Sequence, residues 1–275
     1  MLEKISIVMV EPQHPGNIGS VARAMKTMDL KNLVLVAPRR YPDPQALWRS
    51  ANATDILEKA VVLETLEEAL SEIQFVVGTS ARVRQLSPKI LEPRSLGPKL
   101  AALNPGSSTA ILFGREDSGL TNEELQKCHV QLQIPASEEY GVLNLAMAVQ
   151  IVAYELFVFF KTNADEAREN KSLPSNSASE ERFWDRPRAS QDKIEALIAQ
   201  IERSLYTSGY LSENNPGLVL QRIRRMLMRN SLDHTEVQIL HGFIKKLTNS
   251  NDASGKCVIV KAFLISANDL FLRWI

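Results

Sequence analysis

The string Glu-Pro-Gln-His-Pro-Gly-Asn-Ile-Gly-Ser-Val-Ala-Arg, from Glu11 to Arg23, holds residue types that suit anion binding. A loop rich in proline and glycine follows a strand-like run there and leads into a helical pattern. Glycines permit a close approach to the backbone, and a helix N-terminus attracts anions. Arg23 can share a helix face with Gly16, Gly19 or Ser20. The segment is therefore either a phosphate-binding turn with an arginine aimed at RNA, or a capped helix start with a solvated arginine.

Two further polar loops each follow an apolar, strand-like run. Their residues are Thr79, Ser80, Ala81 and Arg82 in the first loop, and Gly114, Arg115 and Glu116 in the second. Ligands of parallel α/β sheets bind at the carboxyl ends of strands, which is where both loops lie. The first loop could also be an ordinary polar turn. Arg115 and Glu116 could form a structural ion pair, and they could equally hold a substrate.

A fourth loop follows the apolar run that ends at Ile134 and reaches a helical pattern through Gly141, Val142 and Leu143. Asn144 stands where a helix cap is expected, so the segment could be an ordinary loop with a capped helix. The first turn near Gly16 lacks the G-x-G-x-x-G fingerprint, which makes a dinucleotide oxidoreductase the weaker alternative.

Six apolar runs predict the strands that position these loops: residues 5–10, 33–36, 61–63, 75–79, 109–113 and 130–134. Helical patterns lie between them, beginning with residues 17–28 and ending with residues 143–160. Near-continuous apolar strands that alternate with helices predict an α/β domain, with a parallel sheet covered on both faces. We expect this domain to span residues 1–161.

The second part of the chain has a different composition. Residues 162–180 are polar and predict a flexible linker. Helical patterns return within residues 181–275, at about 190–208, 216–229, 235–250 and 256–272, so we expect a small helical extension. Arg222 and Arg225 belong to a basic stripe there, which is either a solvated helix face or a contact to an RNA backbone.

Composition excludes several classes of protein. Lysine and arginine number 32, as do aspartate and glutamate, which excludes a uniformly basic coat for nucleic acid. Cys128 and Cys257 lie far apart, and no spacing suggests a metal site, so we expect free thiols and no metal. The N-terminus does not resemble a signal peptide. Residues 143–160 are interrupted by polar side chains, which favours a core helix over a membrane span. We therefore expect a cytoplasmic protein.

In this order, the loops resemble the motifs of the SPOUT methyltransferases, in their TrmH-like class. Residues 17–23 resemble the first motif, residues 112–120 the second and residues 143–146 the third. The resemblance implies a deep C-terminal trefoil knot, in which three loops bind S-adenosyl-L-methionine. The implied cofactor-binding residues are Thr79, Ser80, Ala81, Gly114, Arg115, Glu116, Ile134, Gly141, Val142 and Leu143. The family's third motif usually has a serine where this chain has Val142, which puts a substrate contact of that hydroxyl in doubt.

The resemblance also implies an activity, namely methylation of a ribose 2′-hydroxyl in tRNA at cytidine or uridine 32 of the anticodon loop. The alternatives are a 2′-O-methyltransferase for rRNA or another tRNA position, and a knotted RNA-binding module without catalysis. Family members are homodimers with composite active sites. Arg23 is then the implied catalytic residue, assisted by Asn17 and Asn144. We expect it to clamp a phosphate rather than act as a base, because arginine does not readily lose its proton. The candidate RNA-binding residues are Arg23, Arg82, Arg84, Arg222 and Arg225.

Overall fold

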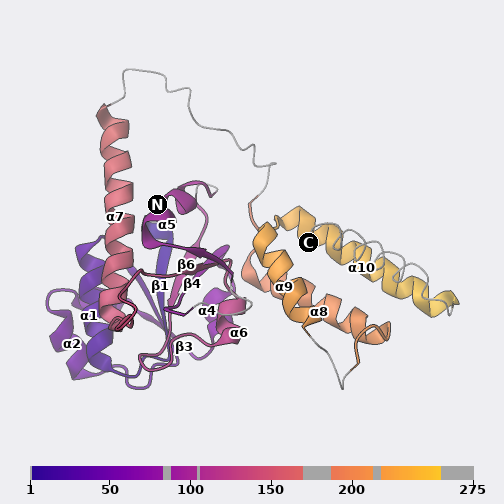
Figure 1. The fold of residues 1–275 in the computed structure, drawn as a ribbon, viewed down its shortest axis with the longest axis horizontal. Helices are drawn as coiled ribbons and strands as arrows, with labels where there is room; N and C mark the ends of the chain where they lie inside the picture. Colours follow the sequence, from indigo (N-terminus) through magenta and orange to yellow (C-terminus); the bar gives the residue numbers. More distant parts are fainter. Residues whose placement is uncertain (1, 83–87, 104–105, 170–186, 213–217, 255–275) are drawn as a thin grey trace.

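The computed structural model describes residues 2–82, 88–103, 106–169, 187–212 and 218–254 (Figure 1). Within them a seven-stranded parallel sheet has the order β3-β2-β1-β6-β4-β7-β5. The strands are β1 (Ile5–Val10), β2 (Asn32–Val36), β3 (Val61–Leu63), β4 (Phe75–Thr79), β5 (Lys89–Leu91), β6 (Thr109–Phe113) and β7 (Val130–Leu132). The predicted parallel sheet is confirmed. The order of strands in a sheet does not reveal whether the chain is knotted, so the trefoil knot stays a prediction.

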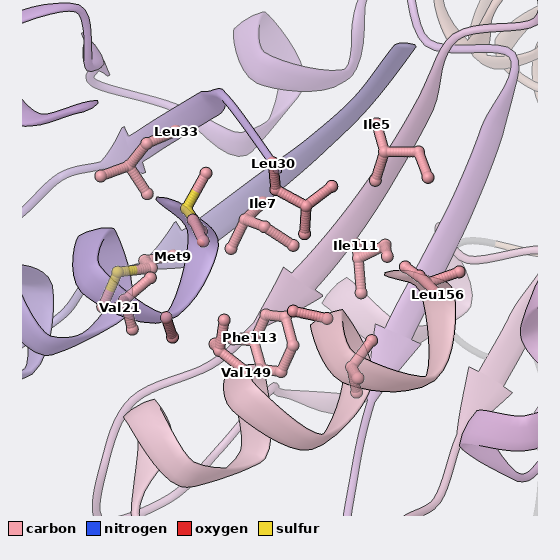
Figure 2. Packing of buried hydrophobic residues seen from close by; sticks show 14 of the residues in the cluster. Ile5, Ile7, Met9, Val21, Leu30, Leu33, Ile111, Phe113, Val149 and Leu156 are labelled. Carbon is pink, nitrogen blue, oxygen red and sulfur yellow. The ribbon is translucent and has the colours of Figure 1, made fainter. Parts of the chain in front are cut away.

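Helices cover both faces of the sheet (Figure 1). One face carries α1 (Pro15–Thr27), α2 (Pro44–Ser50), α3 (Thr54–Glu58), α5 (Pro93–Ala101) and α7 (Leu145–Glu169), and the other carries α4 (Leu66–Leu70) and α6 (Asn122–Gln126). A short 3-10 helix, Leu2–Lys4, precedes β1. Side chains of a strand alternate between faces. In β1, Ile7 and Met9 therefore join the core under α1 and α7 (Figure 2), while Val8 joins the core under α4.

Helix α7 is the one described helix long and apolar enough to cross a membrane by length and composition, over residues 145–163. Its inner face includes Val152, Val149 and Leu156, which are fully buried in the core of the sheet domain. Figure 2 shows Val149 and Leu156 in this core. It therefore packs as the core helix that the sequence predicts. The helix runs to Glu169, beyond the domain end expected at residue 161.

Helices α8 (Gln191–Thr207), α9 (Val219–Asn230) and α10 (His234–Ser254) form a separate unit with its own apolar core. It docks through backbone hydrogen bonds at the start of α8, where the Gln191 N–H donates to the Ile73 carbonyl at 3.0 Å. The Gln74 side chain adds a bond to the Arg188 carbonyl at 3.0 Å. The expected helical extension is thus confirmed for these three helices, and it contacts the sheet domain beside α4.

The strands agree closely with the sequence patterns, with two differences. Strand β7 ends at Leu132, so Ile134 lies in the following loop. Strand β5 was not predicted, because it is a three-residue edge strand with mostly exposed side chains and no apolar run. The helix expected at residues 256–272 lies outside the described residues, as does most of the predicted linker.

Candidate functional site

A cavity of about 430 Å³ lies at the carboxyl edge of the sheet. Thr79, Phe113 and Leu132, the last residues of β4, β6 and β7, contribute to its wall. The structure brings all ten residues of the expected cofactor set to this cavity: Thr79, Ser80, Ala81, Gly114, Arg115, Glu116, Ile134, Gly141, Val142 and Leu143. Loops up to 64 positions apart in the chain therefore meet because their strands are parallel neighbours.

The loop after β6 folds back tightly on itself at the cavity. The Gly119 N–H donates to the Arg115 carbonyl at 2.9 Å, and the Arg115 N–H donates to the Gly119 carbonyl at 3.3 Å. A Cβ at Gly114 would lie 2.1 Å from the carbonyl carbon of Gly119. Only glycine fits there, because no side-chain movement can relieve a clash with backbone.

Glu116 joins this loop to the start of α1. Its carboxylate accepts hydrogen bonds from the Gln13 N–H at 2.9 Å, the His14 N–H at 3.1 Å and the Asn17 Nδ2 at 2.9 Å. Burial acts to raise the pKa of Glu116, but these hydrogen bonds outweigh it and the pKa is lowered. The anion at this helix start is therefore the protein's own carboxylate. This favours the structural interpretation of the turn over a vacant phosphate site.

Asn144 extends the network to the third motif. Its Nδ2 donates to Asn17 Oδ1 at 3.1 Å, and its Oδ1 accepts from the Ala146 N–H at 2.9 Å. The second bond is a cap at the start of α7, as expected of asparagine. One residue thus caps the helix and links α7, through Asn17, to Glu116.

Arg115 does not pair with Glu116, so the ion pair considered from the sequence is wrong. Its guanidinium instead donates to Glu11, with Nε to Oε2 at 3.0 Å, and to Glu124, with Nη2 to Oε1 at 3.0 Å. Hydrogen bonds to these two carboxylates raise the pKa of Arg115, and the bond to Arg115 lowers the pKa of Glu11. Arg115 therefore lines the cavity, but two carboxylates of the protein already balance its charge, which gives it a structural role.

Arg23 lies apart from the cavity. Its side chain is exposed on α1, it does not line the cavity, and it forms no ion pair with a described residue. The glycines of its helix serve packing, because a Cβ at Gly19 would lie 2.1 Å from the Ala46 carbonyl oxygen of α2. A single chain therefore does not bring Arg23 to Asn17 and Asn144.

Of the other candidate RNA-binding residues, some line the cavity and others lie away from it. Arg82 lines the cavity with an exposed side chain, whereas Arg222 and Arg225 lie on α9 and do not line it. Arg84 lies outside the described residues. His14 and Tyr140 also line the cavity, although they are not among the residues predicted from the sequence. Both stand inside the loops already singled out, so their position next to the motif residues was the available signal.

Comparison with known proteins agrees with the site's geometry. The SpoU rRNA Methylase family model matches residues 4–154, and that of the C-terminal domain of the tRNA methyltransferase TrmJ matches residues 192–256. The chain is 42% identical over 251 residues to the tRNA (cytidine/uridine-2′-O-)-methyltransferase TrmJ of Escherichia coli O6:K15:H31, covering 91% of this chain and 98% of that protein. The Salmonella typhimurium TrmJ is also 42% identical, covering 91% and 99%.

Among solved structures, TrmJ from Z. mobilis ZM4 superposes with a TM-score of 0.73 at 28% identity, covering 88% of this chain and 98% of that one. The similarity thus includes both the sheet domain and the helical unit. The chain therefore belongs to the SpoU methylase family, and within it to the TrmJ methyltransferases.

Proposed function

We propose that the protein methylates the ribose 2′-hydroxyl of a cytidine or uridine in tRNA, with S-adenosyl-L-methionine as the methyl donor. One observation of the structure supports this most: the three motif loops meet at one cavity, where Asn17 donates a hydrogen bond to Glu116 and Asn144 donates one to Asn17. The relatives named above carry this activity in their names.

The cavity suits the cofactor in size and charge. Its volume of about 430 Å³ lies in the usual range of roughly 300–1,000 Å³ for small-molecule sites. Hydrogen bonds from Gln13 and Ser118 lower the pKa of Asp117, so Asp117 and Glu116 are both anionic near pH 7. Negative charge beside the cavity favours a cationic sulfonium. When bound, S-adenosyl-L-methionine supplies an electrophilic methyl group. The ten residues of the expected cofactor set, all of which line the cavity, would hold it, with Arg115 contributing through its backbone.

The chain must stabilise the negative charge that develops on the ribose oxygen, because a hydroxyl is a weak nucleophile. Arg23 suits this role, since its guanidinium stays charged and can bind a phosphate and the developing alkoxide together. Asn17 and Asn144 position the loops around the acceptor. The hydroxyl proton then passes to the neighbouring phosphate or to water.

A homodimer would supply Arg23 to the cavity of its partner. The outer face of α7 supports this arrangement, because Met147, Tyr154 and Val158 are exposed at helical spacing. They lie opposite the buried Val149, Val152 and Leu156. An exposed apolar stripe of this kind typically marks a protein interface. We infer that a second copy of the chain covers it.

We expect Tyr154→Glu to convert the dimer into a monomer, because the interface would have to bury an unpaired carboxylate. Sedimentation should give the 30.7 kDa mass of one chain for this variant and twice that mass for the wild type. Tyr210→Glu is the matched control, since Tyr154 and Tyr210 are 51% and 50% exposed and Tyr210 lies in the helical unit. A Tyr154→Glu dimer as stable as the wild type would contradict this interface.

Val142 gives a test of substrate contact at the third motif. Its side chain is 62% exposed at the cavity. We expect Val142→Ser to raise kcat/KM for tRNA about threefold to tenfold, because a new hydroxyl hydrogen bond contributes about 0.5–1.5 kcal/mol. The KM for the cofactor should not change, since backbone contacts survive the substitution. Val142→Ala removes the methyl groups without adding a hydroxyl, so an equal gain in that variant would exclude the hydrogen bond as the cause.

We also propose that Arg82, Arg84, Arg222 and Arg225 contact the tRNA backbone. Arg224, on the same helix as Arg222, instead pairs with Glu195 of α8 through Nη2 and Oε2 at 2.8 Å, so the basic stripe is partly structural. We expect Arg222→Gln to weaken tRNA binding about threefold, as one lost phosphate contact. Filter binding at fixed salt measures this, with Lys193→Gln, an exposed cation of α8, as control. Equal affinities of the two variants would remove Arg222 from the contact set.

The target nucleotide is best tested by mass spectrometry of tRNA digested after reaction with the purified protein. We propose cytidine or uridine 32 of the anticodon loop. A methyl group at another tRNA position, or on rRNA alone, would establish the alternative substrate. No transfer at all would leave an RNA-binding module.

We propose a cytoplasmic location and the division into a methyltransferase domain at 1–161, a linker at 162–180 and a helical extension at 181–275. Helix α7 continues through the first eight residues of that linker.

A further inference from the structure

A second cavity, of about 400 Å³, lies at the opposite edge of the sheet. Phe75, Lys89 and Val130 line it, and they are the first residues of β4, β5 and β7. The strands are parallel, so this is the amino edge, whereas the proposed cofactor site lies at the carboxyl edge. Helix α9 supplies another part of the wall, including Arg225 and Arg229. The cavity therefore exists because the helical unit docks on the sheet domain.

All ionic residues in the described wall of this cavity are positively charged. The ionic residues that line it are Lys89, Lys99, Arg225 and Arg229, and its described wall includes no aspartate or glutamate. Lys89, Arg225 and Arg229 form no ion pair with any residue that the structure places. This contrasts with Arg224 of the same helix, which pairs with Glu195. The like charges of Lys89, Arg225 and Arg229 therefore repel one another across the cavity, and an anion bound between them would stabilise the arrangement.

His129 adds a neutral donor at the same cavity. Its Nδ1 accepts a hydrogen bond from the Val76 N–H at 3.1 Å, which leaves the proton on Nε2. Burial lowers the pKa of His129 to about 3, and the charges of Arg188 and Lys99 act in the same direction. The imidazole is therefore neutral near pH 7. Its Nε2 forms no hydrogen bond to a residue in the described ranges.

We propose that this cavity is a binding site for a phosphate group, carried either by RNA or by a small free phosphate compound. Arginine and lysine side chains recognise phosphate by charge, and arginine also by its planar set of donors. The site lies at the edge of the sheet away from Asn17 and Glu116, so the phosphate that it binds is not the one beside the ribose to be methylated. It is an anion site separate from the proposed cofactor cavity, and its existence does not depend on the proposed reaction.

The test compares full-length wild type with the double variant Lys89→Gln plus Arg229→Gln. Melting temperatures are measured in inorganic phosphate and in chloride at equal ionic strength. We expect phosphate to raise Tm by about 3 °C in the wild type and by less than about 1 °C in the double variant. Lys245→Gln removes an exposed cation of α10 that does not line the cavity, and it should behave as the wild type. Single variants replace the double variant if its Tm in chloride shows that it does not fold.

Filter binding of tRNA to the same proteins then identifies the source of the phosphate. If the source is RNA, the double variant binds tRNA about tenfold more weakly and its salt dependence is reduced by roughly one to two phosphate contacts. If the source is a small compound, tRNA affinity is unchanged while the phosphate-dependent rise in Tm is lost. A phosphate-dependent rise equal in wild type and double variant overturns the proposal, whatever the tRNA affinities.

Discussion

Arg23→Ala is expected to reduce methyl transfer to tRNA by a factor of about a thousand or more, while affinity for S-adenosyl-L-methionine stays near that of the wild type. The reason for the selectivity is position. Arg23 is exposed on α1 and does not line the cofactor cavity of its own chain. Loss of a charged donor that acts mainly in the transition state costs about 100-fold to 1,000-fold in rate, and here the phosphate clamp is lost as well.

Two measurements separate these effects. Calorimetry gives the cofactor affinity, and transfer of a radiolabelled methyl group to tRNA gives the rate. Arg203→Ala, an exposed arginine of α8, is the control for nonspecific loss of positive charge. Retained methyl transfer in Arg23→Ala would remove the catalytic assignment. A loss of cofactor binding equal to the loss of rate would instead make Arg23 part of the cofactor site.

Mixed dimers test whether Arg23 acts across the interface. Arg23→Ala and Asn144→Ala chains each damage one component of the site. If Arg23 serves the partner's cavity, a mixed dimer contains one cavity with both Arg23 and Asn144 intact. We then expect the mixture to recover a substantial fraction of wild-type activity, although each variant alone is inactive. No recovery in a mixture shown to exchange chains would mean that Arg23 and Asn144 of the same chain must act together.

The sequence predicts the cavity better than it predicts the contacts inside it. Apolar runs show where strands end, and in a parallel sheet the carboxyl ends of all strands lie at the same edge. The predicted strand ends alone therefore place Thr79, Gly114 and Ile134 around one ligand. The hydrogen bond between Glu116 and Asn17, 99 residues apart, could not be predicted, because that contact depends on β1 and β6 being neighbours.

The partners of charged side chains were the least predictable feature. Arg115 and Glu116 are adjacent in sequence, yet their side chains point to different partners, Glu11 and Glu124 for Arg115 and the start of α1 for Glu116. The docking of the helical unit was equally hidden, since it depends largely on backbone groups such as the Ile73 carbonyl. Backbone hydrogen bonds leave no pattern of residue types, so the cavity at the amino edge could not be predicted.

Glu116→Gln is expected to lower the free energy of unfolding by about 2 kcal/mol at pH 7 and to weaken cofactor binding at least tenfold. The carboxylate accepts three hydrogen bonds, from Gln13, His14 and Asn17. Glutamine keeps the shape but replaces one acceptor oxygen with an NH₂ donor, which faces donors already present. Hydrogen bonds to a charged group contribute about 1.5–3 kcal/mol each when buried, and partial exposure of this site reduces the sum.

The effect should depend on pH in a definite direction. The folded-state pKa of Glu116 lies below its ordinary value of 4.5, so its contribution is fully present above about pH 4.5 and is lost as the pH falls through the folded pKa. Wild type and Glu116→Gln should therefore differ most near neutral pH and converge in acid. The free energy of unfolding of the variant should still fall as the pH is lowered, because Glu11 and Asp117 also have lowered pKa values.

Urea denaturation at pH 7 and pH 3.5, with calorimetry of cofactor binding, measures both consequences. Glu123→Gln is the matched control, since it removes an exposed carboxylate close in sequence that makes no ion pair with a described residue. Because Glu116 connects Asn17, and through it Asn144, to the loop after β6, its loss should disturb all three motifs together. Cofactor affinity should therefore fall even if Glu116 itself does not contact the ligand. A variant that loses stability but binds the cofactor normally would show that the network supports the fold alone, and that the cavity is held in shape by the sheet.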